Sequence, residues 1–166
     1  QETYKNLPWI IIGHSMGGLV QTHTLIDNKL SLPLKAQILS APLFGVSVEV
    51  PLVKDLAALA AFHLYPKLTL SNEIKNPQLS RDAAVLVEYE KDPLRHDQMS
   101  PGVYIGFLQA MEYVHKQASE LKIPLLLQLA GQDTVVSNIE TLRFFDSMGA
   151  TLKVKKVYHD SHHEIY

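Results

Sequence analysis

The sequence contains no cysteine, so neither disulfide bonds nor thiolate metal sites can form within it. It also lacks an excess of basic residues, because 15 lysines and arginines face 17 acidic residues for a formal net charge of −2. This balance gives no electrostatic basis for binding nucleic acid. No apolar run approaches the roughly 20 residues that a membrane-spanning helix needs. Residues 1–9 show neither the basic nor the apolar region of a signal peptide.

The composition is otherwise that of a globular domain with a substantial core. Hydrophobic residues make up 46% of the 166 positions and charged residues 19%. The sequence holds no internal repeat and no segment of low complexity. We therefore expect the chain to build a single core.

Short apolar runs alternate with segments of helical spacing along the chain. The run at residues 9–12 contains three isoleucines and is followed by Gly13, which predicts a strand buried on both faces. Within the run at residues 152–158, lysines alternate with apolar residues, which favours a strand at the edge of a sheet. Strands that alternate with helices predict an α/β domain with a parallel sheet. The predicted strands cover residues 9–12, 36–41, 124–130 and 152–158, and helices are predicted at residues 17–29 and 138–148.

The region from residue 43 to about residue 120 interrupts this alternation. We predict that it is a helical insertion, or cap, between two parts of the α/β core at residues 1–42 and 121–166. The stretch at residues 52–64 is rich in alanine and leucine, and it suits either a core position or a lid over an apolar pocket. The helix-like stretches of the cap are residues 52–64, 80–90 and 101–119.

A serine stands between glycines where the first predicted strand meets the first predicted helix, in the sequence GHSMGG at residues 13–18. A serine hydroxyl becomes a nucleophile when a base removes its proton, and a sharp strand-to-helix turn exposes it to that base. Such a turn needs small residues two positions before and after the serine, where Gly13 and Gly17 flank Ser15. The backbone NH of Met16, at the positive end of the helix, can bind a developing oxyanion. We therefore predict that Ser15 is a nucleophile.

A catalytic triad on such a sheet needs an acid and then a histidine later in the chain. Asp133 follows the predicted strand at residues 124–130, which suits the acid. Asp146 and Asp160 compete with it, but Asp146 lies inside a predicted helix and Asp160 lies beside several histidines. We therefore predict Asp133 as the acid, with an ordinary loop aspartate or helix cap as its alternative role.

The histidine should follow the last predicted strand, where the sequence offers His159, His162 and His163. A histidine several positions past the end of the strand can extend to the serine, which favours His162 or His163 over His159. The residues alone do not separate these two. The three histidines and Asp160 also permit a metal site, which is the weaker alternative because the triad accounts for them with fewer assumptions.

The remaining histidines have no partner that the sequence identifies, and we interpret them as structural or surface residues. His14 adjoins Ser15, but we expect its side chain to point away from the serine. The five residues are His14, His23, His63, His96 and His115.

Several of these segments together resemble the α/β-hydrolases of the monoglyceride lipase and lysophospholipase family, which is serine aminopeptidase-like. GHSMGG resembles the family's nucleophile turn, and SAPL at residues 40–43 resembles the end of its next strand. LSRD at residues 79–82 and DPL at residues 92–94 are typical of its cap. PLLLQLAGQDTVV at residues 124–136 resembles the acid-bearing segment. HEIY at residues 163–166 resembles the histidine segment, in which the histidine directly precedes a glutamate, so the resemblance implies His163 rather than His162.

The resemblance also implies parts of the fold outside this sequence. Family members begin with further strands and with a His-Gly loop that supplies a second oxyanion amide, and they continue past the histidine into a final helix. We therefore expect the chain to be the C-terminal part of a longer protein, with the last four strands of its sheet side by side. The first of these strands would be a bare apolar edge.

The resemblance implies a serine hydrolase that cleaves carboxylic esters through an acyl-enzyme and needs no cofactor. The apolar cap suits a fatty acyl chain, so monoacylglycerols or lysophospholipids are the expected substrates, and it suits peripheral contact with a membrane or micelle. A broader carboxylesterase, thioesterase or peptidase with the same triad is the alternative among enzymes. The alternative that is not an enzyme is an interaction module that keeps the fold without catalysis. Stoichiometric zinc in the purified protein would instead indicate the metal site.

Overall fold

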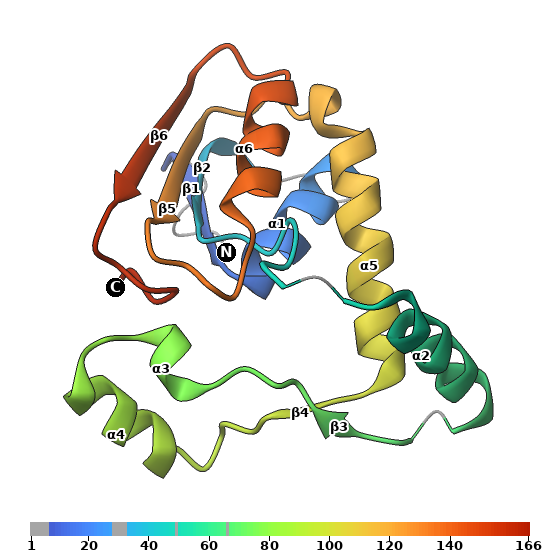
Figure 1. The fold of residues 1–166 in the computed structure, drawn as a ribbon. Coiled ribbons are helices and arrows are strands. Elements are labelled where there is room, and N and C mark those ends of the chain that lie inside the picture. The colour runs from blue at the N-terminus through green and yellow to red at the C-terminus, as the bar shows by residue number, and fades with distance from the viewer. Residues whose placement is uncertain (1–6, 28–32, 49, 66) are drawn as a thin grey trace.

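The computed structural model describes residues 7–27, 33–48, 50–65 and 67–166 and is built around a sheet of four strands (Figure 1). All neighbouring strands are parallel, so each connection crosses from one end of the sheet to the other. This confirms the α/β class predicted from the sequence. In sheet order the strands are β1 (Trp9–His14), β2 (Leu34–Ser40), β5 (Leu125–Ala130) and β6 (Lys153–Tyr158).

Three helices lie together on one side of this sheet (Figure 1). α1 (Met16–Ile26) follows β1, α5 (Pro101–Lys116) packs against α1, and α6 (Asn138–Ser147) connects β5 to β6. α6 begins after Ser137, whose hydroxyl accepts a hydrogen bond from the amide of Glu140. A short 3-10 helix, η2 (Ala118–Glu120), leads from α5 toward β5.

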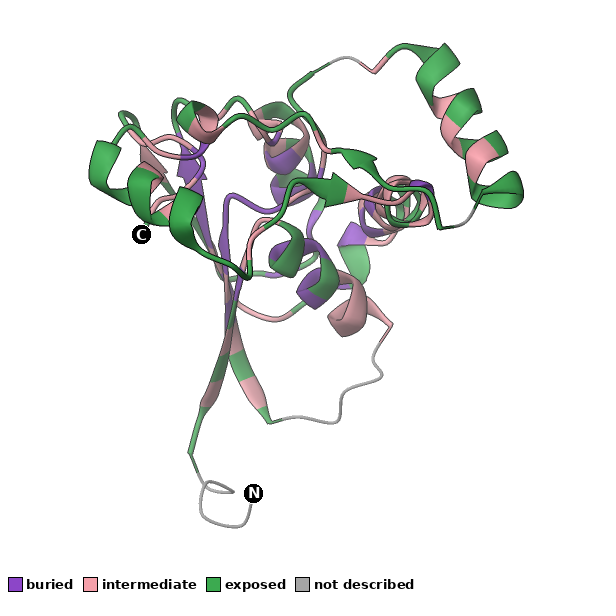
Figure 2. Cartoon of the chain, turned by 90° about the horizontal axis from the view of Figure 1, so that it is seen from below, coloured by how far each residue is buried: buried purple, intermediate pink, exposed green. Residues whose placement is uncertain are grey.

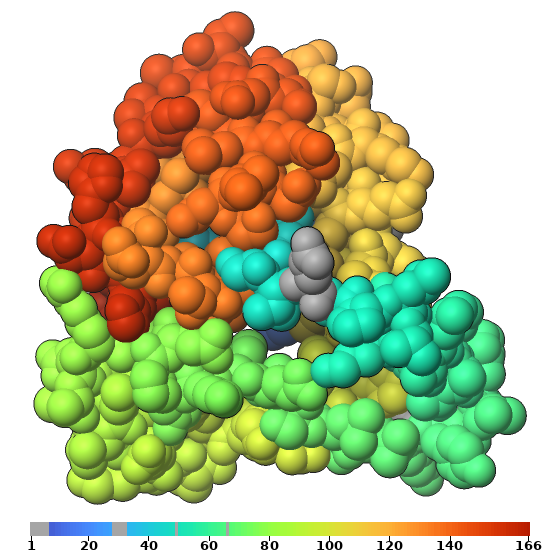
Figure 3. Space-filling view, viewed as in Figure 1, coloured from blue at the N-terminus to red at the C-terminus, as the bar shows by residue number. Residues whose placement is uncertain are grey.

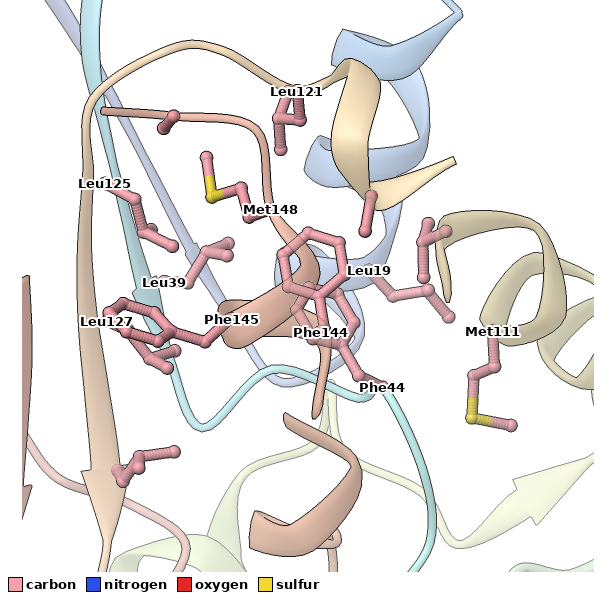
Figure 4. Packing of buried hydrophobic residues seen from close by; sticks show 14 residues of the cluster. Leu19, Leu39, Phe44, Met111, Leu121, Leu125, Leu127, Phe144, Phe145 and Met148 are labelled. Carbon is pink, nitrogen blue, oxygen red and sulfur yellow. The ribbon is translucent and has the colours of Figure 1, made fainter. Parts of the chain in front are cut away.

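Leucine and phenylalanine side chains fill the space between the sheet and these helices (Figure 4). Leu39 on β2 and Leu127 on β5 are register partners, and both are fully buried. The rings of Phe44 and Phe144 contact each other with centroids 4.3 Å apart. Complete burial of one such side chain contributes about 1.5–3 kcal/mol, so this cluster is the main source of the fold's stability.

Apolar side chains on the opposite face of the sheet remain exposed in the described part of the chain. Ile12, Ile38, Leu126 and Val154 form one row across the four strands, because each is the register partner of the next. Ile12 is 62% exposed and Val154 is 54% exposed. The prediction that the first strand is buried on both faces was therefore wrong, since β1 is an edge strand with only one covered face.

The chain leaves the core after β2 and forms the cap before it returns through α5. No residue of α2 (Leu52–Leu64) is buried, and Figure 2 shows this helix at the periphery of the molecule. None of the helices in the described ranges has the length and apolarity to cross a membrane. The other cap elements are β3 (Leu70–Ser71), α3 (Asn76–Leu79), α4 (Ala83–Lys91) and β4 (Gln98–Met99), and β3 pairs with β4 antiparallel.

Most helices begin and end close to the predicted residues. α2 has the predicted bounds, and α4 begins at Ala83 because the carboxylate of Asp82 accepts from the amide of Ala84. The predicted end of the first helix, Lys29, lies outside the described residues. The domain boundary near residue 120 stays a prediction, since α5 begins in the cap and ends in the core, where Val114 is fully buried.

We predict that Phe144→Ala lowers the free energy of unfolding by about 3–5 kcal/mol, because the truncation leaves a cavity in the core. Ile139→Ala on the same helix is the matched control, since Ile139 is 78% exposed. Its truncation should cost at most about 0.5 kcal/mol. Chemical denaturation of the two variants measures both values, and equal losses would contradict the assignment of the buried face of α6.

Candidate active site

Ser15 stands between β1 and α1 in a backbone conformation that few non-glycine residues adopt. Its φ is 50° and its ψ is −121°. The amide of Ser15 donates to the carbonyl oxygen of Ser40 at 3.0 Å, and the carbonyl oxygen of Ser15 accepts from the amide of Leu43 at 3.0 Å. The end of the neighbouring strand β2 therefore fixes the turn that carries the serine hydroxyl.

Close packing around this turn requires two of its three glycines. A β-carbon on Gly13 would lie 2.7 Å from Oε1 of Gln21, and one on Gly18 would lie 2.8 Å from the β-carbon of Pro42. A β-carbon on Gly17 would meet no described atom within 4 Å outside its own helix. The predicted need for a small residue thus holds at Gly13 but not at Gly17, because it is Gly18 that faces the loop after β2.

Three side chains from distant parts of the sequence form one hydrogen-bonded chain. Nε2 of His163 lies 2.8 Å from Oγ of Ser15, and Nδ1 of His163 lies 2.8 Å from Oδ2 of Asp133. Oδ1 of Asp133 accepts from the amides of Val135 and Val136 at 2.8 and 2.9 Å. The Asp133 side chain is fully buried, and that of His163 is 4% exposed. The residues meet because the carboxyl ends of parallel strands lie at the same edge of a sheet.

The competing acids and histidines lie elsewhere. Asp146 is exposed near the end of α6, and Asp160 and His159 are exposed in the turn after β6. Nδ1 of His162 lies 2.9 Å from the carbonyl oxygen of Pro77. Within the described ranges, no three histidine, aspartate or glutamate residues converge as metal ligands would. The structure therefore brings together Ser15, Asp133 and His163 rather than any of the alternatives.

The cap is joined by hydrogen bonds to the loops that carry the acid and the histidine. The amide of Glu164 donates to the carbonyl oxygen of Leu79 at 2.9 Å. The side-chain amide of Gln78 donates to the hydroxyl oxygen of Thr134 at 3.2 Å. In Figure 3 the C-terminal residues lie directly against the green cap segment. α3 thus connects the loop after β5 to the loop after β6, a role that its four-residue sequence did not indicate.

His14 has partners that the sequence did not reveal. Its Nε2 lies 3.1 Å from Oε2 of Glu164, and its Nδ1 lies 3.2 Å from Oγ of Ser40. Its ring packs beside the ring of His163, with centroids 4.9 Å apart. The sequence could not identify these partners, because they meet His14 only when the loop after β6 folds back over the end of β1.

Glu164 also binds the cap through its side chain. Its Oε1 accepts a hydrogen bond from the hydroxyl of Tyr89 on α4 at 2.7 Å. The hydrogen bond with His14, opposed by burial and assisted by the bond from Tyr89, lowers the pKa of Glu164 to about 2. Burial, followed by the hydrogen bond to Glu164, raises the pKa of Tyr89 to about 12. At neutral pH a charged carboxylate therefore lies beside His14, whose ring packs against that of His163.

A cavity of about 680 Å³ lies between the core and the cap, with Ser15 and His163 in its wall. This volume is within the usual range of small-molecule sites. Met16, the first residue of α1, lines the cavity beside Ser15. The cap side of the cavity includes Ile74 and Arg95, so apolar and charged groups both face it. A small molecule that enters the cavity can reach the serine hydroxyl.

Comparison with known proteins identifies the family to which this arrangement belongs. A family profile described as serine aminopeptidase, S33, matches residues 1–166. The chain belongs to this family of α/β-hydrolases. Its parallel sheet flanked by helices is the fold of this α/β-hydrolase family.

Named relatives of this hydrolase are a phospholipase and monoacylglycerol lipases. Phospholipase YtpA of Bacillus subtilis is 26% identical over 162 residues, which are 97% of this chain and 62% of the relative. Monoglyceride lipase of Rattus norvegicus is 26% identical over 168 residues, which are 100% of this chain and 54% of the relative. The crystal structure of Paleococcus ferrophilus monoacylglycerol lipase has a TM-score of 0.86 at 26% identity, and the match covers 95% of this chain and 61% of that one. The chain thus spans less than two thirds of the length of these relatives.

We predict that Gly18→Ala destabilises this hydrolase and that Gly17→Ala does not. The methyl group on residue 18 would collide with Pro42, and relief of such a clash costs about 1–3 kcal/mol. The methyl group on residue 17 has open space, and an alanine in a helix is favoured over glycine by about 1 kcal/mol. Thermal unfolding of the two variants provides the comparison. A lower melting temperature for Gly17→Ala than for Gly18→Ala would contradict this description of the turn.

Proposed function

We propose that this hydrolase cleaves carboxylic esters with Ser15 as the nucleophile, His163 as the general base and Asp133 as its orienting partner. The observation that carries the proposal is the unbroken hydrogen-bonded chain from Oγ of Ser15 through His163 to the buried Asp133. Ser15 and His163 also line the cavity between core and cap, where a substrate can meet the hydroxyl.

In the proposed reaction, Oγ of Ser15 attacks the ester carbonyl carbon while its proton passes to Nε2 of His163. The carbonyl oxygen becomes an oxyanion, and the amide of Met16 at the N-terminus of α1 donates to it. His163 then gives the proton to the leaving oxygen, which departs as the alcohol and leaves an acyl group on Ser15. Water attacks this acyl group while Nε2 of His163 takes its proton. The carboxylic acid leaves, and the proton returns to Oγ of Ser15.

Asp133 suits the orienting role because both of its oxygens have fixed partners. Two backbone amides bind Oδ1, which leaves Oδ2 to accept a hydrogen bond from Nδ1 of His163. A proton held on Nδ1 leaves the lone pair of Nε2 facing the serine hydroxyl. The buried carboxylate also offsets the positive charge that His163 gains when it removes the serine proton.

The second oxyanion donor, in this proposal, is an amide from a part of the whole protein outside this chain. The support is that the chain spans only 62% of the phospholipase and 54% of the rat lipase that it resembles. Tetrahedral intermediates of acyl transfer are usually bound by two such donors, and loss of one costs about 10²–10³ in rate.

We propose monoacylglycerols or lysophospholipids as the substrate class. Two relatives, a phospholipase and a monoglyceride lipase, have names that support lipid esters. α2 supports them too, because it presents exposed apolar residues on the cap that a fatty acyl chain, a membrane or a micelle surface would cover, among them Leu52, Val53 and Leu56. A broader esterase, thioesterase or peptidase is the second candidate, and the description of the matching family as serine aminopeptidases favours the peptidase among these.

A substrate panel tests the proposal on the full-length protein. We expect hydrolysis of a long-chain monoacylglycerol or lysophospholipid to exceed that of an aminoacyl amide, with release of fatty acid as the readout. Ser15→Ala should lower kcat by at least about 10³-fold, because removal of a triad member leaves only binding and oxyanion stabilisation. Ser47→Ala is the matched control, because the Ser47 hydroxyl donates to the carbonyl oxygen of Val136 and the residue does not line the cavity.

Two results would contradict the proposal. If Ser15→Ala kept the activity of the unaltered protein, the nucleophile would be a different group. If the folded full-length protein cleaved no ester, thioester or amide, the interaction-module alternative would take its place.

A further inference from the structure

One arginine in the wall of the cavity has no anionic partner among the described residues. Arg95 lies between α4 and β4, is partly buried, and lines the same cavity as Ser15. No carboxylate of the described ranges forms a salt bridge with its guanidinium, whereas the guanidinium of Arg143 binds Glu140 at 3.1 Å. A guanidinium stays charged in proteins, and its planar set of donors matches carboxylates and phosphates. Arg95 therefore offers an uncompensated cationic donor to whatever enters the cavity.

An aromatic ring holds this guanidinium in place. The Cζ atom of Arg95 lies 4.3 Å from the centre of the Tyr89 ring, a distance at which the face of the ring attracts a cation. The hydroxyl of Tyr89 donates to Glu164 at 2.7 Å, which fixes the ring to the loop after β6. His163 precedes Glu164 in that loop, and its Nε2 faces the hydroxyl of Ser15. Two contacts therefore connect the cation to the segment that carries the proposed general base.

Most charged residues of the cavity wall come from one stretch of the cap, whereas apolar residues lie in the segments that carry the proposed triad. Met16 directly follows Ser15, and the amide of Val135 donates to Asp133. The stretch that runs from the end of α4 to β4 supplies the charged lining residues Glu90, Asp92, Arg95 and Asp97. An uncharged headgroup would displace water from these charges and give them no ionic partner, which costs free energy. The cavity wall therefore suits a substrate that joins an apolar ester to a charged headgroup.

We propose that Arg95 binds the phosphodiester group of a lysophospholipid with a zwitterionic headgroup while the acyl ester of that lipid lies at Ser15. The inference rests on the proposed function and narrows its substrate class, since a monoacylglycerol has no phosphate for Arg95. Two oxygens of a phosphodiester can accept hydrogen bonds from one guanidinium. Only a glycerol unit separates the ester from the phosphate, so one cavity of about 680 Å³ can hold both groups.

The carboxylates on the same stretch of the cap determine why the headgroup is zwitterionic rather than purely anionic. Glu90, Asp92 and Asp97 outnumber Arg95, so this part of the wall has a net negative charge. A purely anionic headgroup would be repelled by it, whereas an ammonium group beyond the phosphate would be attracted. Phosphocholine and phosphoethanolamine headgroups carry that ammonium group.

The test compares lysophosphatidylcholine, lysophosphatidylglycerol and a monoacylglycerol of the same acyl chain on the full-length protein, all below their critical micelle concentrations. We expect Arg95→Gln to lower the ratio of kcat/KM for lysophosphatidylcholine to that for the monoacylglycerol about tenfold, because a charge-assisted hydrogen bond is lost. Arg81→Gln is the matched control, since Arg81 is an exposed cap residue that does not line the cavity, and it should leave the ratio unchanged. Lysophosphatidylglycerol has the phosphodiester without the ammonium, and equal cleavage of it would contradict the zwitterionic headgroup.

Binding of an uncleavable analogue separates this inference from the proposed function. In an ether analogue of lysophosphatidylcholine an ether replaces the ester, so its dissociation constant, measured by calorimetry, does not depend on hydrolysis. We expect Arg95→Gln to weaken its binding to the full-length protein about tenfold and Arg81→Gln to leave it unchanged. Glycerophosphocholine, which lacks the acyl chain, should bind more weakly than the analogue, and equal binding would contradict a lipid site.

The two proposals fail in different ways. If the protein cleaves esters but Arg95→Gln changes neither the substrate ratio nor the binding of the ether analogue, the inference is overturned. If Arg95→Gln weakens binding of the analogue and no ester is cleaved, the headgroup site stands and the proposed function fails.

Discussion

The hydrogen bonds that attach the backbone of Ser15 to the end of β2 are the constraint on which the candidate site depends. A non-glycine residue at a φ of 50° costs about 1–3 kcal/mol, and it persists only when its surroundings hold it. The hydrogen bonds with Ser40 and Leu43 keep Ser15 in this conformation. The close approach of Gly18 to Pro42 brings the turn around Ser15 and the chain after β2 together. The serine hydroxyl consequently stands at the edge of the sheet, within reach of residues that follow β5 and β6.

The second constraint comes from the cap, which binds the same loops from the opposite side. Gln78 contacts the loop that carries Asp133, while Leu79 and Tyr89 contact the residue that follows His163. The cap thus forms one wall of the cavity and also fixes the segment from which His163 reaches Ser15. α2, at the far end of the cap, has no buried residue, so one end of the cap is fixed to the sheet edge that carries Ser15 and the other presents an apolar surface.

Local patterns in the sequence predicted the four strands, the parallel sheet and the positions of Ser15 and Asp133, because strand ends and a Gly-x-Ser-x-Gly turn are properties of neighbouring residues. The choice between His162 and His163 needed a family resemblance. In the structure His163 faces the serine, whereas Nδ1 of His162 lies beside the carbonyl oxygen of Pro77. The pair of Tyr89 and Glu164 had no local signal, since 75 residues separate them. The family resemblance predicted that β1 lies at an edge, whereas its composition alone wrongly predicted two buried faces, because apolar composition indicates what a strand can bury and not which neighbours cover it.

We propose that His163 and Asp133 activate Ser15 through the hydrogen bonds that join the three side chains. An intact mass spectrum after exposure to a fluorophosphonate probe tests this activation, because the probe reacts with activated serine hydroxyls. We expect one adduct on the unaltered protein, none on Ser15→Ala and much slower labelling of His163→Ala and Asp133→Asn. An adduct that persists on Ser15→Ala, or a folded full-length protein that is never labelled, would contradict it.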